Sequence, residues 1–210
     1  MSIANKVSGF NRQRKWDLFI QEFPPRSNTR ILDVGFSDRE YSPNDNFIEK
    51  YYPFPEMLTA LGIDKPIDFT MRYPRVKAIQ YAGDVFPFAG KQFDVCWSNA
   101  VIEHVGSHEK QLGFLKEIKR VSRRAFITTP NRYFPIEPHT RTPLLHYLPK
   151  KLFESFLRAI GKKWATGDYM NLLGIKEICG LLKGADIKNY RIMRNKLFGA
   201  TLDFVMIFEC

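Results

Sequence analysis

Four short apolar segments of the chain each end in acidic, small polar or glycine residues. They end in Asp33-Val34-Gly35, in Asp64, in Gly83-Asp84-Val85 and in Ser98-Asn99. If the segments are parallel strands, their ends lie along one edge of a sheet, where ligands bind near the point at which strand order reverses. A carboxylate there can accept two hydrogen bonds from a pair of ribose hydroxyls, and a glycine lets the backbone approach a ligand closely.

The residues after the first segment argue against a cofactor that carries a pyrophosphate. A dinucleotide requires a G-x-G-x-x-G turn, but residues 35–40 read GFSDRE, with one glycine and two acids. The spacing from Asp33 to Asp64 (64 − 33 = 31) also exceeds the roughly 20 residues of that fingerprint. A cofactor with a cationic centre and no phosphate tolerates acidic neighbours, and S-adenosylmethionine is such a cofactor.

Strands and helices are predicted to alternate along the chain. Apolar runs favour strands at 30–35, 58–64, 76–84, 93–99 and 124–130, helices at 10–22, 46–51, 109–120, 148–164 and 175–184, and a final strand pair at 187–195 and 201–208 with Gly199 in its turn. This alternation predicts an α/β fold, with a seven-stranded, mostly parallel sheet, helices on both faces and a C-terminal antiparallel β-hairpin.

The leading helix, at 10–22, has an apolar side and a basic side. Its apolar side carries Trp16, Phe19 and Ile20, whereas we expect the charged groups of Arg12, Arg14 and Lys15 to stay in water.

Six motifs together make the chain resemble the class I S-adenosylmethionine-dependent methyltransferases, particularly the small group often labelled type 11. The motifs are ILDVG (31–35), GID (62–64), GDVFPFAGKQFDV (83–95), SNAVIEHVG (98–106), TTPNRYFPIEPHT (128–140) and LLHYLP (144–149). The resemblance covers nearly the whole chain. It implies one Rossmann-like domain over 1–210, with an N-terminal helical segment at 1–29 and a substrate-cap insert at 131–174. The chain departs from the family at the glycine-rich turn, where only Gly35 remains.

The resemblance also implies which residues bind S-adenosylmethionine. Asp33 and Gly35 would line its methionine end, and Asp64 would bind its ribose hydroxyls. Asp84 would accept a hydrogen bond from the adenine amino group, and the backbone N–H of Val85 would donate one. The full set of implied cofactor-binding residues is Asp33, Gly35, Asp64, Gly83, Asp84, Val85, Ser98 and Asn99.

Methyl transfer is an in-line displacement in which alignment of the reactants and exclusion of water supply much of the catalysis. A general base is needed only when the nucleophile arrives protonated. His139, beside Glu137 in the loop after the fifth strand, is the candidate base, because histidine titrates near neutral pH and loops carry function. Its alternative is a histidine that only packs the loop. Glu103 and His104 are interpreted as capping the helix that follows them, and we predict no metal site.

The charge of the chain is asymmetric. The formal net charge is +10; residues 1–105 hold 13 basic and 13 acidic residues, and residues 106–210 hold 19 and 9. Such asymmetry indicates an anionic partner. The predicted helix at 148–164 is amphipathic and basic, which fits a cap over the substrate or a helix lying on an anionic membrane. We therefore expect a small or lipid-linked acceptor of anionic character, and peripheral contact with an anionic membrane.

Two other functions stay open. A nucleic-acid or protein methyltransferase would use the same cofactor, and the positive charge supports it, but the chain shows no separate binding module. A non-catalytic binding protein with the same fold is supported by the loss of all but one glycine from the glycine-rich turn. The three cysteines lack metal spacing and indicate reduced thiols in a cytosolic protein. No apolar run reaches the about 20 residues of a membrane span.

Overall fold

The computed structural model describes residues 3–136, 140, 142–167 and 170–210. These residues form a seven-stranded sheet of order β3-β2-β1-β4-β5-β7-β6. Its strands are β1 (Ile31–Val34), β2 (Leu58–Gly62), β3 (Lys77–Gln80), β4 (Phe93–Asn99), β5 (Ser122–Pro130), β6 (Tyr190–Leu197) and β7 (Ala200–Glu209). Strands β1 to β5 pair in parallel, and β7 runs antiparallel to β5 and β6. The predicted fold class is confirmed.

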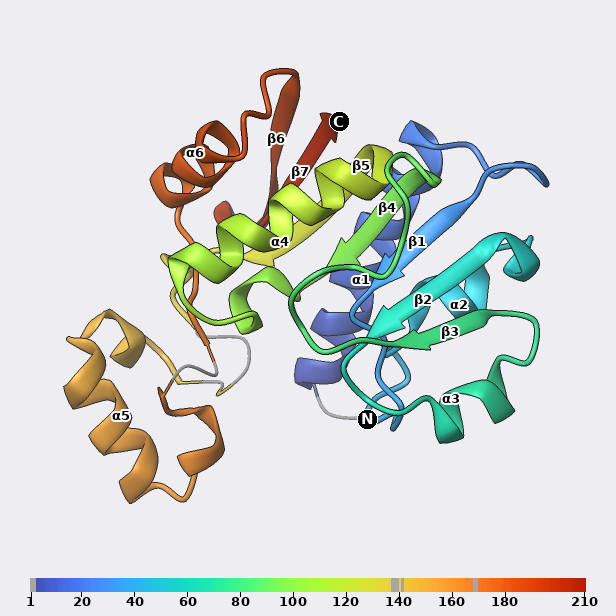
Figure 1. Cartoon of the computed structure of the whole chain (residues 1–210). Coiled ribbons are helices and arrows are strands. Elements are labelled where there is room, and N and C mark those ends of the chain that lie inside the picture. The colour runs from blue at the N-terminus through green and yellow to red at the C-terminus, as the bar shows by residue number, and fades with distance from the viewer. Residues whose placement is uncertain (1–2, 137–139, 141, 168–169) are drawn as a thin grey trace.

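Helices cover both faces of the sheet (Figure 1). α1 (Ile3–Glu22), α2 (Phe47–Tyr51) and α3 (Ile67–Arg72) pack on one face, and α4 (His108–Val121) and α6 (Ile175–Gly184) pack on the other. In β1, Ile31 packs with the first group of helices, whereas Leu32 and Val34 pack with the second. The alternation of side chains along a strand therefore puts Asp33 on the face covered by α1 and α2.

The basic side of α1 differs from the prediction. Trp16 and Phe19 pack against Trp97 of β4, as a buried face should. Lys15, however, is only 4% exposed, and its Nζ lies 3.8 Å from Oδ2 of Asp203 in β7. The expectation that Lys15 stays in water is wrong, because the C-terminal hairpin lies against this side of the helix and supplies a buried carboxylate.

Several element boundaries also differ from the expected ones. The second strand stops at Gly62, two residues before Asp64, and the third covers only residues 77–80. The helix expected at 148–164 is α5 (Lys150–Ala159), which ends before Gly161, a residue with φ +76°. α3 was not predicted. The terminal hairpin turns through Phe198 and Gly199, both with positive φ, as a two-residue type I′ turn requires.

α5 lies to one side of the sheet, next to the amino-terminal ends of α4 and α6 (Figure 1). With the short helices η3 (Leu145–Tyr147) and η4 (Lys163–Ala165) it forms a small unit with its own core of Phe153, Leu157 and Ala165. We call this unit, residues 142–167, the cap. None of the described helices combines the length and the apolarity that a bilayer span requires.

Candidate functional site

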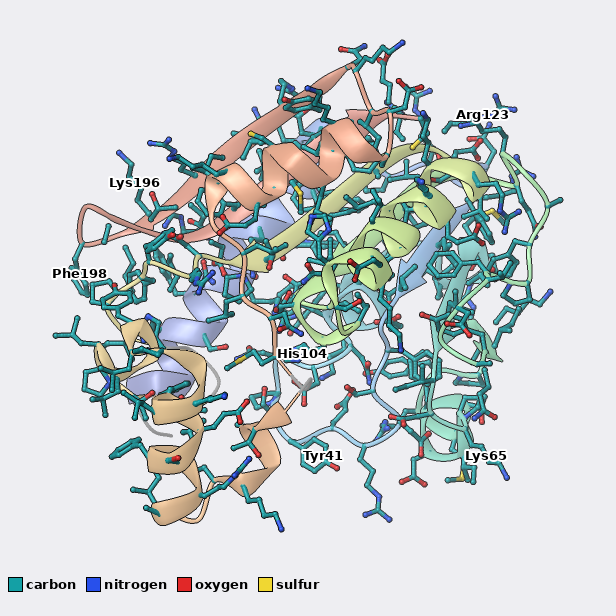
Figure 2. The ribbon with its side chains drawn as sticks, turned by 60° about the vertical axis from the view of Figure 1, so that its left-hand side comes forward. Tyr41, Lys65, His104, Arg123, Lys196 and Phe198 are labelled. Carbon is teal, nitrogen blue, oxygen red and sulfur yellow. The ribbon has the colours of Figure 1, made fainter. Side chains whose placement is uncertain are left out.

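The carboxyl ends of β1 to β4 face one edge of the molecule, which we call the switch edge because strand order reverses between β1 and β4. In Figure 2, Tyr41 and Lys65 lie along this edge with His104 beside them, and Arg123, near the start of β5, lies at the opposite end. The loops after β1, β2 and β4 therefore meet here, as the sequence predicted.

Gly35 leaves β1 with a backbone conformation that suits glycine alone. Its φ is +109°, and its N–H donates to the carbonyl oxygen of Leu61 at 2.8 Å. A Cβ on this residue would lie 2.3 Å from Cγ2 of Val101. The single glycine left in the turn is therefore the one that lets the loops after β1 and β4 touch.

Residues 36–46 replace the rest of a glycine-rich turn with an ordered polar loop. The Asn46 side chain accepts from the Ser37 N–H at 2.9 Å and donates to the Ser37 carbonyl oxygen at 2.8 Å. Glu40 accepts from the Tyr73 hydroxyl at 2.6 Å and pairs with Lys50 at 2.9 Å. This loop holds α2 under the end of β1.

Asp33 is buried below the switch edge, where its carboxyl group interacts with that of Glu49 in α2. Burial raises the pKa of Asp33 to about 6, against the lowering effects of Glu49 and of Arg12 in α1. Sequence reasoning missed Glu49. The sequence signal was an acid directly after the apolar residues Phe47 and Ile48 in a short helix. In the structure all three residues are buried.

Asp64 and Asp84 lie in exposed turns after the neighbouring strands β2 and β3. The side-chain amide of Gln80 donates to the Ile63 carbonyl oxygen at 2.9 Å and ties the two turns together. Gly83 has φ +98°, and Val85 is 71% exposed. Both carboxylates are thus open to a ligand at the switch edge.

Ser98 and Asn99 end β4 in different environments. Ser98 is buried, and its hydroxyl donates to the Val34 carbonyl oxygen at 3.0 Å, so that its side chain joins β4 to β1. Asn99 accepts from the Thr128 hydroxyl at 2.9 Å. Its buried Nδ2 has no hydrogen-bond partner among the described residues. An unpartnered buried donor is costly, which makes Asn99 a fitting contact for an acceptor atom of a ligand.

Glu103 and His104 do not cap α4. They form the short helix η2 (Ile102–His104), and α4 begins after Ser107, whose side chain accepts from the Lys110 N–H. Glu103 is instead fully buried and accepts from the Thr129 hydroxyl of β5 at 3.0 Å. The capping prediction is wrong because Ser107, a preferred N-cap residue type, lies nearer the start of the helix.

A cavity of about 280 Å³ separates the cap from α4 and α6. Its lining includes His108, Arg132, His146, Phe153 and Glu177, together with residues of the segment 170–173 that precedes α6. Arg132 pairs with Glu177 at 3.6 Å on its wall. The candidate base His139, with Glu137, lies outside the described residues.

The residues at the switch edge fit S-adenosylmethionine. Asp33 lies near the end of β1, and Asp64 and Asp84 follow the adjacent strands β2 and β3. The unpartnered amide of Asn99 ends β4, and residues 35–40 contain no phosphate-binding turn. Such a donor set suits a cationic cofactor with ribose hydroxyls and excludes a pyrophosphate there.

Comparisons with known proteins agree with this geometry. A family model described as a methyltransferase domain matches residues 54–125. No curated protein sequence matches the chain.

Among solved structures, a SAM-dependent methyltransferase from Aquifex aeolicus is 14% identical with a TM-score of 0.58, over 99% of this chain and 98% of that one. A 1,6-didemethyltoxoflavin-N1-methyltransferase from Burkholderia thailandensis is 13% identical with a TM-score of 0.60, over 95% and 77%. The CurJ carbon methyltransferase is 12% identical with a TM-score of 0.59, and this chain spans 53% of its length.

At these identities the solved structures establish the shared fold, and the family model adds the match of the central segment. The chain therefore has the fold of the class I S-adenosylmethionine-dependent methyltransferases, and its residues 54–125 match a methyltransferase domain.

Proposed function

We propose that the protein binds S-adenosylmethionine at the switch edge and transfers its methyl group to a small or lipid-linked acceptor of anionic character. The observation that carries the cofactor site is the row of Asp33, Asp64 and Asp84 on adjacent strand ends, next to the unpartnered amide of Asn99. The methyltransferase family match and relatives solved with S-adenosylhomocysteine bound indicate the same cofactor.

Each part of the switch edge has a role in this proposal. Asp33 and Gly35 hold the methionine end, Asp64 binds the ribose hydroxyls, and Asp84 with the Val85 N–H binds the adenine. When bound, S-adenosylmethionine would supply a methyl group on a cationic sulfur: the lone pair of an acceptor atom would bond to the methyl carbon in line as the carbon–sulfur bond breaks, and the sulfur would leave as a neutral thioether. The loops around the edge contribute alignment and exclusion of water, and His139 is the candidate to take a proton from the acceptor.

The cavity beneath the cap supports a small-molecule acceptor. It has room for a group of modest size, and its lining mixes apolar side chains with His108, His146 and Arg132. The 131–174 segment would then act as the substrate cap of a single domain over 1–210. The Burkholderia relative is a small-molecule methyltransferase by its name.

The outer surface of the cap supports an anionic, lipid-linked acceptor. Leu144 and Leu152 are 57% and 58% exposed, and exposed basic side chains include Lys151 and Arg158. Apolar and basic groups side by side on α5 and on the segment before it fit the interface of an anionic membrane.

The cofactor site is tested by titration calorimetry with S-adenosylmethionine. We expect the intact protein to bind S-adenosylmethionine with micromolar affinity. Asp64→Ala should bind it at least about 10-fold more weakly than the intact protein, because a charge-assisted hydrogen bond contributes about 1.5–3 kcal/mol. Asp68→Ala, which removes a nearby carboxylate in the first turn of α3, is the matched control and should bind normally.

Absence of binding by the intact protein would contradict the proposal and favour a non-catalytic binding protein. The acceptor class is tested separately, by filter binding to RNA and DNA across salt concentrations. Tight, salt-dependent retention would favour a nucleic-acid methyltransferase instead.

A further inference from the structure

Glu49 is a buried acid whose partner is another acid. Asp33 and Glu49 are each 5% exposed, and each carboxyl group shifts the pKa of the other. Within the part of the chain that the structure describes, neither Glu49 side-chain oxygen has a hydrogen-bond partner when both acids are taken as ionised, so we infer that a proton shared with Asp33 satisfies them. A hydrogen bond between two carboxyl groups needs a proton on one of them, so the pair holds a single negative charge.

The surroundings place that proton on Glu49. Burial and the neighbouring Asp33 charge raise the pKa of Glu49 well above its ordinary value, and Glu40 acts in the same direction. Arg12, on α1, instead favours the charged form of Asp33. Lys50 is drawn away from the pair, because its ammonium group bonds to Glu40 at 2.9 Å and to the Asp45 carbonyl oxygen at 2.7 Å.

The loop after β1 fixes this arrangement. Asn46, at the start of α2, adopts φ +48° and clamps Ser37 through both ends of its side-chain amide. Phe47 and Ile48 then anchor the helix in the core. Glu49 is therefore held beneath the end of β1 by a segment with well-defined contacts.

We propose that Glu49 is a positioning residue of the cofactor site: its protonated carboxyl donates to the Asp33 carboxylate and so holds one negative charge at the end of β1 for the ammonium group of the cofactor's methionine. This inference rests on the proposed function, since it gives Asp33 a cationic partner. It assigns Glu49 no contact with the reacting atoms.

The first test compares S-adenosylmethionine affinity across pH in three proteins. The wild type should lose affinity below about pH 6 as Asp33 becomes protonated. Glu49→Gln retains an N–H donor for Asp33 and should bind within about 3-fold of the wild type at pH 8. Glu49→Leu removes the donor, so its affinity at pH 7 should fall about 10-fold and partly recover at pH 9.

Two outcomes of this test would overturn the proposal. One is equal affinity and an unchanged pH profile in folded Glu49→Leu, which would mean that Glu49 is only structural. The other is loss of binding in Glu49→Gln at pH 8, which would mean that a charge on Glu49 is needed. The second variant keeps the test decisive if Glu49→Leu does not fold.

The second test needs no cofactor. Infrared spectra of the free protein at pH 8 should contain the carbonyl band of a protonated carboxylic acid, and Glu49→Gln should lack it. Glu56→Gln, which removes an exposed carboxylate paired with Arg75, is the control and should keep the band. If the band is present but the protein does not bind S-adenosylmethionine, the proposed function is refuted and the proton-sharing acid pair is still supported. Binding without the band would refute the pair alone.

Discussion

Gly35 and Gly113 illustrate how differently two glycines depend on their surroundings. Gly35 has φ +109° and no room for a Cβ beside Val101, whereas nothing lies within 4 Å of a Cβ built on Gly113 in α4. We expect Gly35→Ala to lower the free energy of unfolding by about 2–4 kcal/mol, from backbone strain and overpacking. Gly113→Ala should raise it by roughly 0.5–1 kcal/mol. Urea denaturation measures both, and equal effects would contradict the tight turn.

The acid pair predicts how stability changes with pH. Both folded-state pKa values are raised above the ordinary values of 3.8 and 4.5. The native state then binds more protons than the unfolded state, so the contribution of this pair to stability falls as the pH rises. For Asp33 the fall occurs between about pH 4 and about pH 6, and for Glu49 it extends to higher pH.

Removing the ionisable Glu49 should therefore stabilise the protein at alkaline pH. We expect the free energy of unfolding of Glu49→Gln to exceed that of the wild type by about 1 kcal/mol or more at pH 8, and the difference to shrink toward pH 4. Denaturant titrations at both pH values measure it. A difference that grows toward pH 4 would mean that Glu49 is ionised in the native protein.

At the scale of elements, α1 is joined to the C-terminal hairpin by a buried ion pair. Lys15 and Asp203 have side chains that are each 5% exposed, and Asn11 donates to the same carboxylate at 2.5 Å. Lys15→Ala should lower the free energy of unfolding by about 3 kcal/mol, because it leaves a buried carboxylate without its cation.

Arg14→Ala is the control for this pair. Arg14 is exposed and donates only to the Lys196 carbonyl oxygen, at 2.7 Å, among the contacts described, so its loss should cost less than about 1 kcal/mol. Equal destabilisation of the two variants in thermal or urea unfolding would show that Lys15 reaches solvent.

At the scale of the whole molecule, the positive charge and the exposed apolar groups of the cap predict binding to anionic membranes. The protein should co-sediment with vesicles that contain phosphatidylserine, should not do so with pure phosphatidylcholine, and should be released by salt. Leu152→Asp should reduce binding about 10-fold or more. Met71→Asp is the charge-matched control, since Met71 is 71% exposed on α3, away from the cap. Equal loss in both variants would indicate a general charge effect.

Most of the fold could be predicted from the sequence, because its signals are local. Apolar runs closed by Gly35 or Asn99 mark strand ends, and Gly199 marks a hairpin turn. The switch edge followed from these, since parallel strands bring their carboxyl ends together. The short α3 gave no comparable signal, because an amphipathic period needs more than six residues to stand out.

What only the tertiary structure decided is the environment of the charged residues. Lys15 reads as a solvent-facing residue of a helix until β7 brings Asp203 beside it. Glu49 reads as a surface acid until α2 packs beneath β1 and sets it against Asp33. The strand pattern arises from residues close together in the sequence. Burial, proton sharing and ion pairing instead depend on which distant segment packs nearby, and so they emerge only when the chain is folded.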